Sequence, residues 1–335
     1  MNKRIFAFFF LLTAVFSTFK PQIAVHAEVS PTSAAECVME RNSRRILYEW
    51  RGDIRLPMAS TTKIATAITV LEDCQNIKEA FGIPSEAVGI EGSSVYLQVG
   101  EMYTAEELLY GLMLRSGNDC AEALAYQVGG SIDGFTAKMN RTAQKAGALH
   151  TNFRNPHGLP CDGHYTTARD LSLITAYALE NPSFREIVST KYYGPRNWKN
   201  KNKLLFQYDG AIGVKTGYTK EAGRCLVSAA EKNGMELVCT VLNSTQMYER
   251  SMQLLNDAFQ SYSYEKIIDE KDMFMVDGQR CNVRQSVFYP LMQGEMEAVE
   301  MNVTPIKSSK NTEIIGQIQI WLAKRLIFSG NLYKL

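Results

Sequence analysis

The chain has 335 residues, 45% of them apolar, and a formal net charge of +1. This length and apolar content are enough for one large domain and one small one. A charge this close to neutral argues against a nucleic-acid-binding protein, which usually presents a strongly basic face, and we expect no nucleic-acid partner.

The N-terminal segment has the pattern of an export signal. Lys3 and Arg4 form a short positive region, residues 5–19 are almost wholly apolar, and small residues at 25–27 suit cleavage. A retained membrane anchor is the alternative, but the apolar run is shorter than the roughly 20 residues that span a bilayer. We therefore predict a signal peptide over 1–27 and a mature protein exported to the cell wall, to the outer face of the cytoplasmic membrane or to the medium. Its membrane association is left open.

Two short strands and a helix are the first elements expected after this signal. Apolar runs predict strands at 37–40 and 46–50 around a turn at 41–44. The spacing of apolar residues predicts a helix from Ser60 to about Glu72. Further helices are expected at 104–113 behind a capping box, at 120–128 behind an Asp119 cap, at 135–145 and at 167–179.

Strands dominate the following part of the chain. They are expected at 213–216, 224–230 and 236–243, and a helix is expected at 249–260. The economical arrangement is a central antiparallel sheet with helices packed on it and a mostly helical insertion at about 72–180. This mixture is an α/β (α+β) fold.

The chain becomes helix-poor after residue 264. Ile318, Ile320 and Leu322 alternate with polar residues, which is typical of a half-buried strand. We therefore predict a main domain over 28–263 and a small β-rich domain over 264–335.

The seven cysteines are an odd number, so at least one thiol is expected to be unpaired. Their spacing matches no zinc-binding pattern, and we expect neither a metal nor another cofactor. Cys225 and Cys239 flank an expected hairpin turn and could face each other. Buried free thiols are the simpler interpretation, and we assign no disulfide.

Ser60 and Lys63 form an S-x-x-K pattern at the start of a helix, so their side chains project from one face. A serine hydroxyl becomes a good nucleophile when a neighbouring base takes its proton. Lysine can be that base only when neutral, a form that burial or a nearby cation such as Lys215 favours. Taken alone, the pattern favours a helix-capping serine and a solvated lysine.

Ser116-Gly117-Asn118 lies in a loop between two expected helices. Ser116 can relay a proton between Lys63 and a leaving amine, and the Asn118 amide can hold a substrate carbonyl. Taken alone, this sequence is better explained as a turn followed by a helix cap.

Lys215-Thr216-Gly217 lies on an expected edge strand of the sheet. Lys215 and Thr216 offer a cation and a hydroxyl to a substrate carboxylate, and Gly217 allows a ligand close to the backbone. The Tyr218 amide can join the Ser60 amide in an oxyanion hole. A turn explains the motif alone equally well.

The three motifs together, in this order, match the motif set of acyl-serine enzymes. His157 and His164 suggest a Ser-His-Asp triad as an alternative, but the chain has no G-x-S-x-G elbow. We interpret both histidines as loop hydrogen-bonding residues and the chain as a serine acyl-transfer enzyme.

At these motifs the chain resembles the low-molecular-mass penicillin-binding proteins that act as serine-type D-Ala-D-Ala carboxypeptidases, relatives of class A β-lactamases. The resemblance covers about 33–262 and includes Asn-Pro-His-Gly-Leu at 155–159 and Thr-Ala-Arg-Asp at 167–170. It implies a β-lactamase/transpeptidase-like fold with a small C-terminal all-β domain. It also implies removal of the terminal D-alanine from peptidoglycan stem pentapeptides.

The same resemblance implies a role for each motif residue. Ser60 attacks the D-Ala-D-Ala carbonyl, Lys63 is its general base and Ser116 helps return the proton. β-Lactams, which mimic the dipeptide, are expected to acylate Ser60. Relatives often bind the carboxylate through a further arginine, for which Arg250 is the nearest candidate. The substrate-binding residues implied are Asn118, Lys215, Thr216, Gly217 and Tyr218.

Two other functions fit parts of the pattern. A class A β-lactamase needs a glutamate-activated water for deacylation, and the corresponding stretch, 155–165, contains no glutamate. A non-catalytic penicillin-binding or wall-sensing protein would keep the pocket, but the intact set of nucleophile, base, relay and clamp argues against it.

Overall fold

The computed structural model describes residues 32–306 and 313–335, and the predicted signal peptide lies outside them. Within these two ranges, no helix combines the length and the apolar character needed to cross a bilayer.

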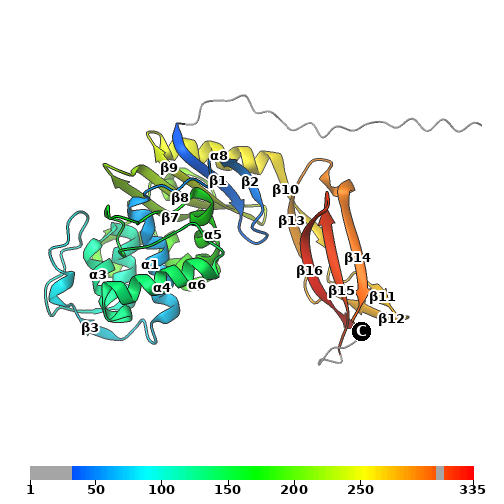
Figure 1. The fold of residues 1–335 in the computed structure, drawn as a ribbon, viewed down its shortest axis with the longest axis horizontal. Coiled ribbons are helices and arrows are strands. Elements are labelled where there is room, and N and C mark those ends of the chain that lie inside the picture. The colour runs from blue at the N-terminus through cyan, green and yellow to red at the C-terminus, as the bar shows by residue number, and fades with distance from the viewer. Residues whose placement is uncertain (1–31, 307–312) are drawn as a thin grey trace, which may run out of the picture. The chain divides into compact units, whose positions relative to one another are not determined.

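A five-stranded antiparallel sheet forms the centre of the main fold (Figure 1). Its strands, from one edge to the other, are β2 (Ile46–Trp50), β1 (Ser33–Glu40), β9 (Met235–Ser244), β8 (Gly223–Lys232) and β7 (Ala211–Thr219). The five predicted strands are therefore confirmed, each within a few residues of its expected bounds. The strand that carries Lys215 is an edge strand, as predicted.

Two apolar cores cover the two faces of this sheet. One core joins α8 (Met247–Ser261) to the sheet through Leu254 and Leu255, and the other contains the remaining large helices. Cys225 belongs to one core and Cys239 to the other, so they point to opposite faces of the sheet. All seven cysteines are free thiols.

The helical region begins differently from the expectation at two places. Ser60 lies in a 3₁₀ turn (Ala59–Thr62), and α1 (Lys63–Asp73) follows it. The Thr104–Glu107 capping box opens α2 (Ala105–Tyr110) as predicted, but the helix then continues as a π-helical turn (Gly111–Arg115). The other helices are α3 (Asn118–Gly129), α4 (Ile132–Lys145), α5 (Ala168–Ala178), α6 (Pro182–Ser189) and α7 (Leu204–Gln207).

The expected Asp119 cap is wrong. The residue before α3 is Gly117, and Asp119 lies inside the first turn of the helix. Its carboxylate is buried and accepts hydrogen bonds from a separate loop, which the sequence order does not reveal.

In the C-terminal part, the described residues after 261 form strands apart from one short 3₁₀ turn (Glu295–Ala298). Strands β10 (Tyr262–Ile268) and β13 (Val287–Met292) form a pair. The predicted alternation is confirmed, since Ile318, Ile320 and Leu322 are buried. A second five-stranded sheet has the order β11 (Phe274–Val276), β12 (Gln279–Asn282), β16 (Arg325–Lys334), β15 (Ile314–Leu322) and β14 (Val299–Pro305).

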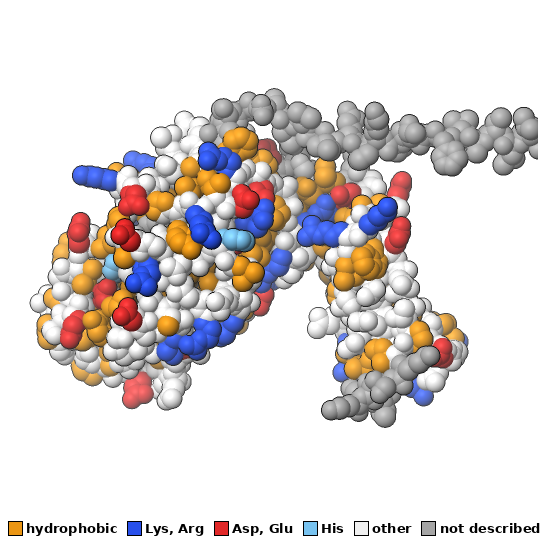
Figure 2. All heavy atoms as spheres, viewed as in Figure 1, with side chains coloured by type: hydrophobic (Ala, Val, Ile, Leu, Met, Phe, Trp, Pro, Cys, Tyr) orange, Lys and Arg blue, Asp and Glu red, His pale blue; other side chains and the backbone are white. Residues whose placement is uncertain are grey.

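Basic and acidic side chains are intermingled with apolar ones on the face shown in Figure 2. On this face, the described charged residues of the two signs are not separated into two large patches.

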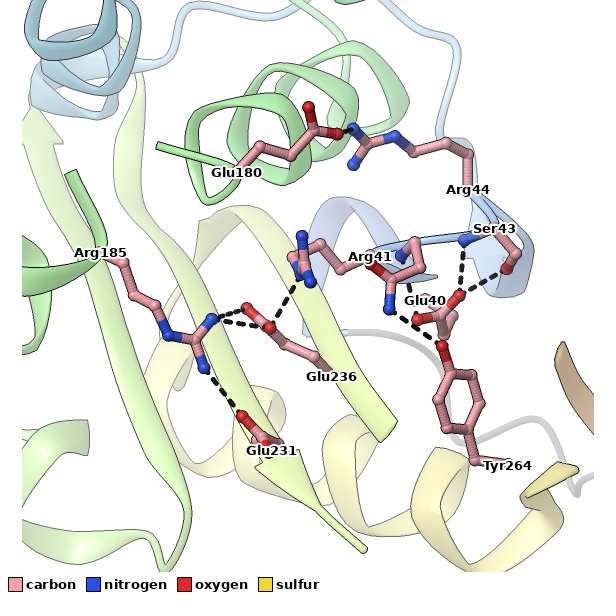
Figure 3. Close-up of polar contacts among 10 residues, drawn as sticks. Glu40, Arg41, Ser43, Arg44, Glu180, Arg185, Glu231, Glu236 and Tyr264 are labelled. Carbon is pink, nitrogen blue, oxygen red and sulfur yellow. Dashed lines mark hydrogen bonds and ion pairs between the residues drawn. The ribbon is translucent and has the colours of Figure 1, made fainter. Parts of the chain in front are cut away.

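A group of charged side chains fastens the β1–β2 turn and α6 to the hairpin of β8 and β9 (Figure 3). Glu236 on β9 has a side chain only 5% exposed and accepts hydrogen bonds from Arg41 at 2.8 Å and Arg185 at 2.7 Å. Arg185 also contacts Glu231 at 2.8 Å. The hydrogen bonds to Glu236 are charge-assisted and partly shielded from water, which makes them the stronger part of this network.

Replacement of Glu236 by alanine should lower the free energy of unfolding by about 1–3 kcal/mol, because two guanidinium groups lose a shielded acceptor. The matched control, Glu231→Ala, should cost only about 0.2–1 kcal/mol because the Glu231 side chain is 47% exposed. Urea unfolding measures both values, and equal losses would contradict the importance given to Glu236.

Candidate active site

Ser60 and Lys63 lie side by side at the junction of the 3₁₀ turn and α1. The Lys63 Nζ atom is 3.1 Å from Ser60 Oγ. The turn is fixed by the Met58 carbonyl, which accepts hydrogen bonds from the Thr61 hydroxyl at 2.6 Å and its amide at 3.3 Å. The side chains of the first motif therefore face each other at hydrogen-bond distance.

Lys63 is completely buried, and its other two partners are neutral groups. Its Nζ atom donates to Asn118 Oδ1 at 2.6 Å and to the His157 carbonyl at 2.7 Å. Burial, and then the positive charge of Lys215, hold the pKa of Lys63 well below its ordinary value. The site thus favours the neutral amine.

Asn118 connects Lys63 to the loop that contains Glu91 and Ser93. Its backbone amide donates to the Ser93 carbonyl at 2.7 Å, and its side-chain Nδ2 donates to the Glu91 carbonyl at 2.5 Å. Ser116, 6% exposed, ends the π-helical turn in a left-handed conformation with φ of 64°. Among the described residues, no hydrogen bond joins the Ser116 hydroxyl to Lys63.

The third motif brings the edge strand β7 against the turn that carries Ser60. A Cβ atom at Gly217 would lie 2.9 Å from Ser60 N, closer than real Cβ contacts occur, so glycine is required here. The backbone at Gly217, the residue before Tyr218, therefore runs beside the Ser60 amide. The Tyr218 side chain is 64% exposed.

Lys215 is buried, with 2% of its surface exposed, and its Nζ atom donates a hydrogen bond to the Thr216 carbonyl at 2.8 Å. Burial, and then the charge of Lys201, lower the pKa of Lys215 to about 7. The site consequently holds two buried amines whose protonation states depend on each other.

Lys201 is a third cation near this site, and the sequence patterns missed it. Its Nζ atom lies 3.3 Å from Ser93 Oγ, and its charge lowers the pKa of both Lys63 and Lys215. No short motif contains Lys201; the only signal was the basic stretch at 191–203.

The loop at 155–159 supports Lys63 through its backbone. The His157 ring accepts a hydrogen bond from the Leu159 amide at Nδ1, and its Nε2 lies 3.0 Å from the Glu122 carboxylate. Gly158, with φ of 89°, packs so tightly that a Cβ atom would lie 1.9 Å from the Ala59 carbonyl. The loop therefore fits directly against the turn that carries Ser60.

Both histidines are loop hydrogen-bonding residues, as predicted. His164 contacts the Thr62 hydroxyl at 2.9 Å and accepts from the Arg154 amide at 3.0 Å. Arg250, in contrast, is paired with the buried Glu36 at 2.8 Å and does not extend into the site. The part of the chain that the structure describes contains no cluster of residues suited to hold a metal ion.

Comparisons with known proteins agree on one family. Residues 21–246 match the family model described as D-alanyl-D-alanine carboxypeptidase. D-alanyl-D-alanine carboxypeptidase DacF of Bacillus subtilis is 34% identical over 267 residues, which is 75% of this chain and 69% of the relative. The D-alanyl-D-alanine carboxypeptidase of Streptomyces sp. strain K15 is 37% identical over 67% of this chain and 86% of its own length. Penicillin binding protein 5 from Haemophilus influenzae superposes with a TM-score of 0.77 at 25% identity, covering 91% of this chain and 97% of that one.

Asp119 should control the order of the loop that contacts Asn118. Its carboxylate accepts from Ser94 Oγ at 2.5 Å, from the Val95 amide at 3.0 Å and from the Leu97 amide at 3.2 Å. In Asp119→Ala, hydrogen exchange at both amides should therefore rise while strand β9 stays protected.

Hydrogen-exchange mass spectrometry of peptides covering 94–98 makes this measurement. Asp119→Asn keeps one acceptor oxygen and should show a smaller increase, and the exposed Asp133→Ala serves as the control on α4. Unchanged exchange at Val95 and Leu97 in the alanine variant would refute the anchoring role.

Proposed function

The chain belongs to the D-alanyl-D-alanine carboxypeptidase family, and from this premise we propose that Ser60 is its acylated nucleophile and Lys63 its general base. The protein is a serine-type hydrolase that removes the terminal D-alanine of D-alanyl-D-alanine substrates, the end of peptidoglycan stem peptides, and it belongs to a class that binds β-lactams. Its substrate places its action outside the cytoplasm.

The hydrogen bonding of Lys63 is the observation that carries this proposal. A neutral amine has two N–H groups and one lone pair. The two N–H groups suit the Asn118 and His157 oxygens at 2.6 and 2.7 Å, which leaves the lone pair for the Ser60 hydroxyl at 3.1 Å. Because burial and Lys215 disfavour the ammonium form, the pair is set to transfer the serine proton to the lysine.

In the acylation step, Ser60 Oγ attacks the carbonyl carbon of the bond between the two D-alanines and its proton passes to Lys63. The amides of Ser60 and Tyr218 stabilise the oxyanion. The C–N bond then breaks, and Ser116 passes a proton from Lys63 to the departing amine. Water hydrolyses the acyl-enzyme and frees Ser60.

Lys215 and Thr216 bind the carboxylate of the leaving D-alanine, with the Lys215 ammonium as the charged partner. Gly217 allows the substrate backbone to lie along β7. Asn118 uses one side-chain N–H for Glu91 and keeps the other for the substrate carbonyl on the acyl side.

We also keep the domain division as part of this proposal: a cleaved signal peptide over 1–27, a catalytic domain over 28–263 and a β-rich domain over 264–335. The match of the family model to 21–246 supports the extent of the catalytic part. The C-terminal apolar core draws its residues from 267–332, which supports the second boundary.

Purified protein should release D-alanine from Nα,Nε-diacetyl-L-Lys-D-Ala-D-Ala, and Ser60→Ala should lower kcat by at least about 10⁴-fold. The exposed Ser189→Ala on α6 is the matched control and should retain full activity. A coupled D-amino-acid-oxidase assay measures release, and a fluorescent penicillin reports acylation. Release by Ser60→Ala would refute the nucleophile assignment. Labelling of Ser60 without any release would favour a non-catalytic penicillin-binding protein.

The pH dependence of kcat/KM should fall through about pH 7 on the alkaline side. Lys215 with a pKa of about 7 is a cation below that pH and neutral above it, so the free enzyme loses its carboxylate partner as the pH rises. The loss should appear mainly as a higher KM. In Lys215→Arg the cation does not titrate in this range, so the alkaline fall should disappear; an unchanged fall would show that another group causes it.

A further inference from the structure

The C-terminal sheet has an outer face that the proposed reaction does not use. Along β15 the residues at 316, 318, 320 and 322 are buried, whereas Gln317, Gln319 and Trp321 between them are half-buried. Because successive side chains of a strand point to opposite sides, these three lie on the side of the sheet away from its core. Strands β14 and β16 flank β15 (Figure 1) and extend this outer face.

The strand register determines which side chains share the outer face, because directly paired residues of neighbouring strands point to the same side. Standard strand spacings give the face a width of roughly 10 Å across the three strands and a length of roughly 13 Å along them. Across β14, β15 and β16 it consists of three rows: Glu300, Trp321 and Leu326, then Asn302, Gln319 and Ser329, then Thr304, Gln317 and Asn331.

Uncharged polar groups dominate the outer face. Six of its nine side chains end in an amide or a hydroxyl group, and only one of the nine is charged. The Gln317 amide donates to Ser329 Oγ at 3.0 Å. Within residues 32–306 and 313–335, the side chains of Asn302, Gln319 and Asn331 form no hydrogen bond. Each of these three amides can therefore both donate to a ligand and accept from it.

A hollow of about 410 Å³ lies at the first row, beside the Trp321 indole. Its lining also contains Asn302, Met301 and two residues of opposite charge, Glu300 and Lys324. This volume is within the range of small-ligand sites in proteins. Because the charges of Glu300 and Lys324 cancel, the hollow suits an uncharged ligand that has an apolar side for the indole.

The composition of the outer face selects among classes of partner. An anionic polymer or an anionic membrane needs a group of cations, and none of the nine side chains is a cation. A stable protein interface needs a continuous apolar centre, whereas the face offers only Trp321 and Leu326. A carbohydrate meets both conditions, because its hydroxyl groups pair with amides and the C–H side of a sugar ring stacks on an indole.

We propose that the outer face of β14, β15 and β16 binds the glycan strand of peptidoglycan, a chain of N-acetylated sugars. Trp321 stacks on one sugar ring, and Asn302 and Gln319 hydrogen-bond the hydroxyl and acetamido groups beside it. The choice of this glycan among carbohydrates rests on the proposed function, since stem peptides are attached to it. Binding the glycan keeps the enzyme at a high local concentration of stem peptides.

The three tryptophans of the chain allow a selective test by NMR of the intact protein with ¹⁵N-labelled indoles. The ligand is peptide-free glycan strands, released from sacculi by an amidase, which carry no D-Ala-D-Ala for the active site. The Trp321 N–H resonance should shift and saturate, while those of Trp50 and Trp198 stay in place. Cellotetraose, which lacks acetamido groups, should bind at least about 5-fold more weakly than chitotetraose, because it forms fewer hydrogen bonds.

The double variant Asn302→Ala/Gln319→Ala should raise the Kd for the glycan about 10-fold, because two hydrogen bonds are lost. Gln127→Ala/Gln144→Ala removes two exposed amides from α3 and α4 and should leave the Kd unchanged. Absence of a Trp321 shift, an unchanged Kd in the first double variant, or equal affinity for the two tetrasaccharides would overturn the inference. D-alanine release is measured separately, so release without glycan binding refutes this inference alone, and glycan binding without release refutes the proposed function alone.

Discussion

The buried amine of Lys63 is the constraint on which the rest of this site depends. An amine without contact to water must have hydrogen-bond acceptors, and three segments far apart in the chain supply them: the turn with Ser60, the start of α3 at Asn118, and the loop carbonyl of His157. The helical insertion and the loop at 155–159 must therefore both be in place before the amine has its partners.

The edge strand β7 contributes the second buried lysine, Lys215. Lys215 is also buried, and its charge disfavours a second ammonium at Lys63, so the two lysines are driven into different protonation states. In the proposed mechanism, Lys63 acts as the base and Lys215 as the cation that holds a carboxylate. Gly217 allows β7 to approach Ser60 closely, as the proposed action of both lysines on one substrate requires.

Much of the fold followed from local sequence patterns, because alternation in strands and the Thr104 capping box are properties of short segments. The three motifs predicted the candidate site residues for the same reason, since each motif is a short local pattern. The patterns could not place Asp119, since its partners come from a loop some twenty residues earlier. Nor could they show that Arg250 is held by Glu36, or that Lys201 lies near two other lysines, because these pairings are set by tertiary packing alone.

The central claim is that Lys63 is neutral in the working enzyme, and its pKa can be measured directly. Lysines labelled with ¹³C at Cε can be titrated by NMR in the Lys215→Arg variant, which removes the second buried amine. The resonance of Lys63 is then identified by its loss when Lys63→Met is added. The account predicts that this resonance titrates well below the pH of the solvent-exposed lysines. A Lys63 resonance that titrates together with the exposed lysines would contradict it.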